Sequence, residues 1–246
     1  MPYTTRDHLL IIVTHVLGNL SLLMMLVFIF TGSLDLVRLN IGEVKALLLN
    51  SFLSIAFFVQ HSGMVRKSFK RWTAPLIEEK YSGAVFSIAS SLLLLLLVIF
   101  WQKSSFMMVS AHGGLRWLLR LIFVLALSGF FWGARSLGSR DTFGIERMRR
   151  NIEGKTTKPA RLFIRGPYRW IRHPLYFFCI VMIWACPDLT ADRLLFNVLW
   201  TLWIIVGIIL EERDLVSQFG PDYIRYQSDV PMLVPTRIPP HSKPNQ

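Results

Sequence analysis

The sequence predicts an all-α membrane protein, a polytopic helical bundle of about six transmembrane helices with a C-terminal amphipathic helix. Two observations predict this class. Of the 246 residues, 53% are hydrophobic and only 17% are charged, whereas soluble domains carry about 25% charged residues. Apolar runs of roughly 20 residues, the length that crosses a bilayer as a helix, also recur along the chain.

Six spans can be placed from the lengths of these runs. The first run, Leu9 to Phe30, is long enough to stay in the membrane as a span instead of serving as a cleaved leader. The third contains the uninterrupted leucine run Leu92–Leu97, which we interpret as a lipid-facing surface. The six expected spans are about 9–31, 44–63, 82–101, 115–137, 174–190 and 193–210.

The basic residues are concentrated in every other loop between these spans, which places them on one side of the membrane. The stretch from Arg135 to Arg172 holds eleven Lys/Arg against three acids, and Arg66 to Lys80 holds five basic residues. Because cytoplasmic loops are rich in Lys and Arg, both termini and both basic loops are expected in the cytoplasm. This distribution accounts for the net charge of +12, so the charge does not indicate nucleic-acid binding.

The chain is expected to form one integral membrane domain over residues 1–246. Residues 1–137 would be an N-terminal four-helix part. Residues 138–246 would be a C-terminal cofactor-binding part made of the basic loop, a helical hairpin and an amphipathic tail. The two cysteines, Cys179 and Cys186, fall in one apolar segment, which favours neither a disulfide framework nor a metal site.

Polar residues gather at the two cytoplasmic ends of the last hairpin. Its short connection, Pro187 to Asp192, predicts two antiparallel helices. The Arg172-His173-Pro174-x-Tyr176 stretch then begins one helix where Glu211 and Glu212 close the other. Titratable groups at a membrane boundary are functional candidates, although a structural arginine–glutamate pair would use the same residues.

An amphipathic segment follows the hairpin. Leu215, Phe219, Tyr223 and Tyr226 recur at four-, four- and three-residue spacing, which places them on one helical face. Gly220-Pro221 interrupts the pattern and predicts two shorter helices. This face is expected to cover the mouth between the two helix ends.

A second polar cluster ends the second span. Gln60, His61 and Ser62 lie where that helix nears the cytoplasm, and Arg66 follows about one turn later. An interfacial anchor explains the adjoining Lys67–Trp72 stretch, with its Trp, Lys and Arg at headgroup level. The Gln-His-Ser run fits an anchor less well and is a candidate site.

These motifs carry a family resemblance. Arg172-His173-Pro174-x-Tyr176, Glu211-Glu212, Phe219-Gly220 and the two later tyrosines resemble the signature of the isoprenylcysteine carboxyl methyltransferase and phospholipid methyltransferase group. In that group's Arg-His-Pro-x-Tyr-x-Gly pattern, this chain has Phe178 at the last position. The segment from Gln60 to Trp72 is similar to the methanethiol S-methyltransferase and NnrU-like membrane families.

The resemblance implies an integral membrane methyltransferase that uses S-adenosyl-L-methionine. The acceptor would be lipid-like, or a small thiol or carboxylate. The partners would be the lipid bilayer and a hydrophobic or small-molecule acceptor, with no nucleic acid. The protein would lie in a bacterial inner membrane with both termini in the cytoplasm. The implied catalytic residues are Arg172, His61 and Arg66. The implied cofactor-binding residues are Tyr168, His173, Pro174, Leu175, Tyr176, Glu211, Glu212 and Tyr223.

Two other functions use the same architecture. A membrane oxidoreductase of the sterol-reductase type, using NADPH, has a similarly built C-terminal half, but no arginine cluster here is clearly dedicated to a 2′-phosphate. A non-catalytic membrane protein would use the arginine–glutamate network only for structure.

Overall fold

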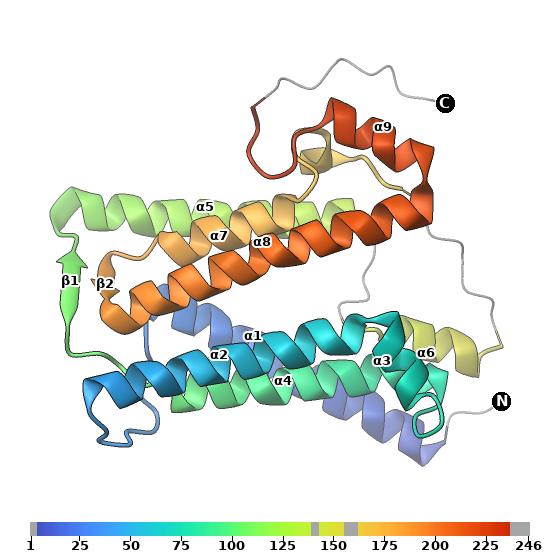
Figure 1. The fold of residues 1–246 in the computed structure, drawn as a ribbon, viewed down its shortest axis with the longest axis horizontal. Coiled ribbons are helices and arrows are strands. Elements are labelled where there is room, and N and C mark those ends of the chain that lie inside the picture. Colours follow the sequence, from blue (N-terminus) through green and yellow to red (C-terminus); the bar gives the residue numbers. More distant parts are fainter. Residues whose placement is uncertain (1–3, 139–142, 155–161, 237–246) are drawn as a thin grey trace. The chain divides into compact units, whose positions relative to one another are not determined.

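The computed structural model describes residues 4–138, 143–154 and 162–236 and is almost entirely helical there (Figure 1). Within these ranges, five helices are long and apolar enough to cross a membrane, which confirms an all-α polytopic membrane bundle. They are α1 (Thr5–Thr31), α2 (Glu43–Val65), α4 (Ser82–Phe100) with the preceding turn η1 (Glu79–Tyr81), α5 (Gly113–Ser136) and α8 (Ala191–Phe219). The shorter elements are α3 (Lys67–Thr73), β1 (Met107–Ser110), α6 (Ile145–Ile152), η2 (Gly166–Arg169), α7 (Pro174–Trp184), β2 (Asp188–Thr190) and α9 (Pro221–Asp229).

By packing, the chain forms two compact units. Unit 1 comprises Met1–Ser110, Asp141–Pro159 and Asp188–Leu199, and unit 2 comprises the remaining segments. Helix α5 therefore packs with the C-terminal elements, and α6 packs with the N-terminal ones. The division of the chain at residue 138 into an N-terminal part and a cofactor-binding part stays a prediction.

Helix α4 is the central helix of unit 1, since α1 and α2 both pack against it. Small side chains at Ala84, Ser87 and Ser91 are buried along it and allow close approach of the neighbouring helices. The lipid-facing interpretation of the leucine run is therefore wrong for Leu94, Leu95 and Leu97, which are 7%, 8% and 0% exposed. A helix that is apolar all round is typical of a buried position.

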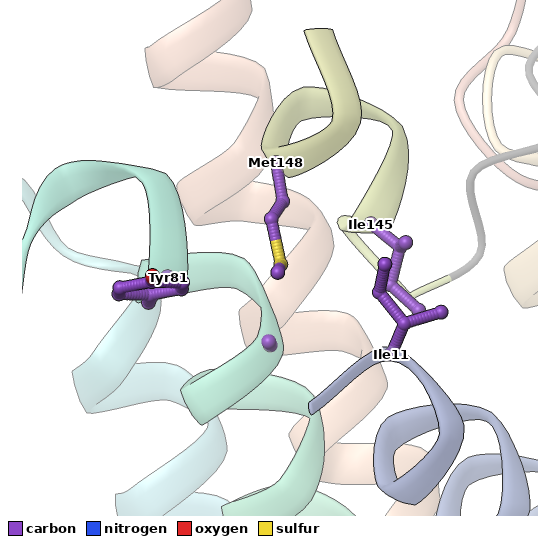
Figure 2. Close-up of a cluster of buried hydrophobic side chains, with 5 residues drawn as sticks. Ile11, Tyr81, Ile145 and Met148 are labelled. Carbon is purple, nitrogen blue, oxygen red and sulfur yellow. The ribbon is translucent and has the colours of Figure 1, made fainter. Parts of the chain in front are cut away.

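The middle of the basic loop is ordered and lies on the α1–α4 side of unit 1. Ile145 and Met148 of α6 are buried in a cluster with Ile11 and Tyr81 (Figure 2). Gly144, which precedes α6, lies very close to Gly83 of α4. A Cβ added to Gly83 would stand 2.8 Å from the carbonyl oxygen of Gly144. The expected basic loop thus contributes an amphipathic helix whose apolar side completes a core.

The start of α8 is held by buried charges in unit 1. The Asp192 carboxylate accepts hydrogen bonds from the Trp101 indole and the Ser104 amide, both at 2.9 Å. The Arg193 guanidinium donates to the carbonyls of Phe28, at 3.0 Å, and Ile29 in the last turn of α1. The Phe28 carbonyl also accepts from the Gly32 amide at 2.8 Å, so Arg193 adds charged donors to the C-terminal end of α1. Next to it, β1 and β2 pair as a short antiparallel ribbon.

In unit 2, α7 packs along α5 (Figure 1). It has 11 residues and ends at Trp184, short of the expected end at residue 190. At 1.5 Å per residue it is about 16 Å long, roughly half the thickness of a hydrocarbon core. The extended chain that follows pairs as β2, so its backbone groups are satisfied without a longer helix.

Helix α8 continues two turns beyond the expected end, so Glu211 and Glu212 lie within the helix instead of closing it. It ends before Gly220, whose φ of 57° and ψ of −131° suit glycine alone, and α9 follows. The predicted interruption is confirmed. The predicted apolar face is also found, because Leu215 and Phe219 pack against a buried cluster that contains Tyr223 and Tyr226.

Candidate active site

The site is formed where the chain enters α7. Gly166 adopts a positive φ of 54° and lies against the end of α5, where a Cβ would overlap Ser136. The one-turn helix η2 then leads to Arg172 and His173. Pro174 occupies the first turn of α7, where its missing N–H costs no hydrogen bond. This entry places Arg172 and His173 at the start of the helix.

Glu212 is the centre of the polar network. Arg172 binds it with two parallel hydrogen bonds, from Nε to Oε1 at 2.7 Å and from Nη2 to Oε2 at 3.0 Å. His173 Nε2 lies 2.9 Å from Oε1, the Tyr223 hydroxyl donates to Oε1 at 3.1 Å, and Gln227 Nε2 donates to Oε2 at 2.6 Å. Both carboxylate oxygens are therefore occupied by protein groups, in a pair whose side chains are only 9% and 12% exposed.

Arg172 also binds the end of α9 and the chain that follows it. Its Nη1 donates to the carbonyl oxygens of Gln227, at 3.0 Å, and Val230. The backbone amides of Arg172 and His173 donate to the carbonyls of Pro231 and Met232, at 2.9 and 3.1 Å. We call residues 230–232 the strap. The guanidinium thus directs four N–H groups at Glu212 and at backbone carbonyls.

Glu211 differs from its neighbour in how it is occupied. The Tyr176 hydroxyl donates to Oε2 at 2.8 Å. Within residues 4–138, 143–154 and 162–236, this is the one side chain that hydrogen-bonds to Glu211. Within those ranges no side chain donates to Oε1 of the half-buried Glu211, whereas both oxygens of Glu212 accept hydrogen bonds from protein side chains.

Three buried tyrosines form the wall behind the network. The Tyr226 hydroxyl donates to the Tyr168 carbonyl at 2.6 Å, and the rings of Tyr223 and Tyr226 meet edge to face at 5.7 Å. Burial raises the pKa of all three phenols, and the Glu212 charge raises the pKa of Tyr223 further. They remain neutral hydrogen-bond donors at physiological pH.

The structure also describes the surroundings of three further predicted site residues, Leu175, His61 and Arg66. Leu175 directs its side chain towards Gly133 of α5. His61 and Arg66 belong to unit 1. The His61 ring lies between Phe57 and Phe86, with ring centres 5.2 and 5.0 Å away, and so faces α4. Arg66 adopts an extended conformation at the break between α2 and α3.

Sequence reasoning missed Gln227, the Tyr226–Tyr168 hydrogen bond and the strap. No sequence pattern marks Gln227 as a site residue, because a glutamine on a short helix is ordinarily a surface residue. The strap contributes backbone carbonyls, which no side-chain pattern reports.

Comparison with known proteins identifies the family of the chain. The family model described as "NnrU protein" matches residues 49–222. The chain belongs to the NnrU family. The match includes the His61 cluster, α7 and the Glu211–Glu212 pair, and it ends at the start of α9.

Curated relatives of this NnrU-family protein are named as methyltransferases. It is 36% identical to a methanethiol S-methyltransferase of a Pseudomonas species over 78% of this chain and 74% of the relative. It is 32% identical to methanethiol S-methyltransferase 1 of Bradyrhizobium diazoefficiens over 80% of this chain and 69% of the relative. Nurim of Rattus norvegicus is 25% identical over 66% of this chain. The chain is thus a multi-pass membrane methyltransferase. No solved structure matches it.

Proposed function

We propose that this NnrU-family protein transfers a methyl group from S-adenosylmethionine to a small thiol, with methanethiol as the first candidate. The acceptor is proposed from the names of its relatives. The observation that supports a cofactor site is the difference between the two adjacent glutamates in the hydrogen bonds they accept. Glu212 is saturated by protein donors, whereas among the described residues only Tyr176 donates to Glu211, whose other oxygen would bind a ligand.

The donor groups around Glu211 suit a zwitterionic cofactor. Glu211 would accept a hydrogen bond from the ribose or from the ammonium group. The amides of Leu175 and Tyr176 precede the first intrahelical bond of α7, which Phe177 donates to His173, and they would bind the carboxylate. S-adenosylmethionine supplies a methyl group already activated on a sulfonium, so the protein chiefly has to align it with the acceptor.

Arg172, Glu212 and Tyr223 act in this proposal as positioning residues. Their hydrogen bonds go to one another and to the strap, so they hold His173 and α9 in place without touching the acceptor. Tyr168 and Tyr223 are 9% and 2% exposed. They would close the adenosine side of the site as a packed wall.

His61 and Arg66 are the proposed acceptor-side residues. A thiol attacks as its thiolate. An imidazole that takes the thiol proton and a guanidinium that attracts the resulting anion would both favour that form. The match to the family model spans both residues and the C-terminal motif. The proposed location is a bacterial inner membrane with both termini in the cytoplasm, where the cofactor is made.

The test compares variants of purified protein in detergent. Glu211→Gln loses a charge-assisted hydrogen bond to the ligand, so its dissociation constant for S-adenosylmethionine should rise about 10- to 150-fold. Titration calorimetry measures that constant, and gas chromatography measures dimethyl sulfide formed from methanethiol. Asp222→Asn, which removes an exposed acid from α9, is the matched control and should bind as wild type does.

Two outcomes would contradict the proposal. Unchanged cofactor affinity in a folded Glu211→Gln variant would show that the site is wrong. Wild-type protein that binds the cofactor but forms no dimethyl sulfide would remove methanethiol from the proposal.

A further inference from the structure

The orientation of α7 has a visible cause on the side away from the glutamates. Phe178 and Leu175 face α5, where they meet Gly129 and Gly133. A Cβ on Gly129 would overlap the Phe178 ring, and one on Gly133 would stand 2.9 Å from Leu175 Cδ2. The two large side chains therefore occupy space that exists only because α5 has glycine opposite each of them.

Helix geometry connects this contact to the site. At about 100° per residue, Leu175 and Phe178 are roughly 60° apart on α7. Tyr176 then lies about 130° from the middle of that pair, on the opposite side, and His173 is the residue that directly precedes the helix. One side of α7 packs against α5 and the other reaches the glutamates on α8. Because both sides turn together about the helix axis, fixing one of them fixes the other.

The α8 side makes hydrogen bonds that depend on this rotation. Tyr176 reaches Glu211 at 2.8 Å and His173 reaches Glu212 at 2.9 Å. A turn of 30° moves a side-chain end on a 6–7 Å radius by about 3 Å, enough to break either bond. Interlocking side chains on the α5 side resist such a turn, because packed interiors have few voids to accept a displaced ring.

We propose that Phe178 is a positioning residue of the methyltransferase: by fitting against Gly129 it sets the rotation of α7 that aims Tyr176 at Glu211 and His173 at Glu212. The proposal rests on the proposed function, since it concerns the same site. It also explains how a phenylalanine is accommodated after the Arg-His-Pro-x-Tyr motif: the ring points away from Glu211 and fills the space over Gly129.

The experiment changes the partner and then restores the volume. Gly129→Val pushes the Phe178 ring away and should raise the dissociation constant for S-adenosylmethionine by about tenfold, since overpacking shifts backbones. Adding Phe178→Ala returns space to the contact and should bring the constant back to within about threefold of wild type. Gly114→Val is the matched control on the same helix, where nothing lies within 4 Å; it should bind as wild type does.

A second readout needs no cofactor. Tyr176→Phe and Glu211→Gln, alone and combined, give the coupling between these side chains in the thermal unfolding of the ligand-free protein. The coupling should be present in wild type, lost with Gly129→Val, and regained with Gly129→Val/Phe178→Ala. A uniform loss of stability would lower every melting temperature without changing the coupling.

The outcomes separate the two proposals. Gly129→Val with wild-type coupling, or a double variant no better than the single one, would overturn the role of Phe178. Wild-type protein that shows the coupling but does not bind S-adenosylmethionine would overturn the proposed function and leave the positioning role standing.

Discussion

At the scale of single residues, two adjacent glutamates have different surroundings. Glu212 accepts from four side chains, and Glu211 accepts from one side chain within the described ranges. Because consecutive helical residues point about 100° apart, the pair reaches two different environments from one turn of α8. We therefore propose that Glu211 binds the ligand and that Glu212 holds the structure of the site together.

Replacing Glu212 should lower the free energy of unfolding more than it lowers the rate of methyl transfer. Glu212→Gln leaves the buried Arg172 guanidinium without its counter-charge, and the free energy of unfolding should fall by about 1.5–3 kcal/mol. Thermal unfolding in detergent measures this. Glu146→Gln is the control, because it breaks an exposed pair with Arg150, 51% and 30% exposed, and such pairs contribute about 0–1 kcal/mol. Equal losses in both variants would contradict the central role of Glu212.

The acceptor side is tested with Arg66. Arg66→Lys keeps the charge and loses the planar fork of the guanidinium. If Arg66 holds the acceptor, dimethyl sulfide formation should fall while the dissociation constant for S-adenosylmethionine stays within about twofold of wild type. His61→Ala should behave similarly. Full turnover in both variants would return these residues to the class of interfacial anchors.

At the scale of elements, α8 and α9 are separate helices that act together on the site. The break at Gly220 turns α9 so that Tyr223 and Gln227 meet Glu212. The strap then pairs with the backbone of Arg172 and His173. Helix α9 is thus tied to the start of α7 by backbone and side chain.

The break depends on glycine at position 220. A Cβ is strained at φ 57° and ψ −131°, so Gly220→Ala should lower the free energy of unfolding by about 1–3 kcal/mol and weaken cofactor binding with it. Gly207→Ala within α8 is the control. Nothing lies within 4 Å of its Cβ position, and alanine should stabilise that helix by up to about 1 kcal/mol. A Gly220→Ala variant as stable as wild type would show that the turn tolerates a side chain.

At the scale of the whole molecule, orientation in the membrane follows from charge. Of the 27 Lys and Arg residues, 21 lie in segments expected on the cytoplasmic side, so the positive-inside rule predicts that the start of α7 and both glutamates lie there. Truncation fusions to a periplasmic reporter after Asn40 and after Ser110 should be active. Activity of a cytoplasmic reporter at either position would reverse the orientation and move the site away from the cofactor.

The sequence by itself determined the class of the protein, five of its membrane helices and the residues of the C-terminal motif. These follow from local properties: the length of apolar runs, the placement of charges and the spacing of a motif. It also predicted the break at Gly220 and the apolar face beyond it, because glycine-proline and a helical repeat are local signals.

Only the tertiary structure decided which glutamate is saturated, which way Phe178 points and how far α7 extends. It also placed the leucine run of α4 in a core, since apolar composition does not distinguish a lipid neighbour from a protein one. Gln227 and the strap belong to the network because α9 and the chain after it lie against the start of α7. These features depend on contacts between segments distant in the chain, and such contacts leave no periodic trace in the residues that make them.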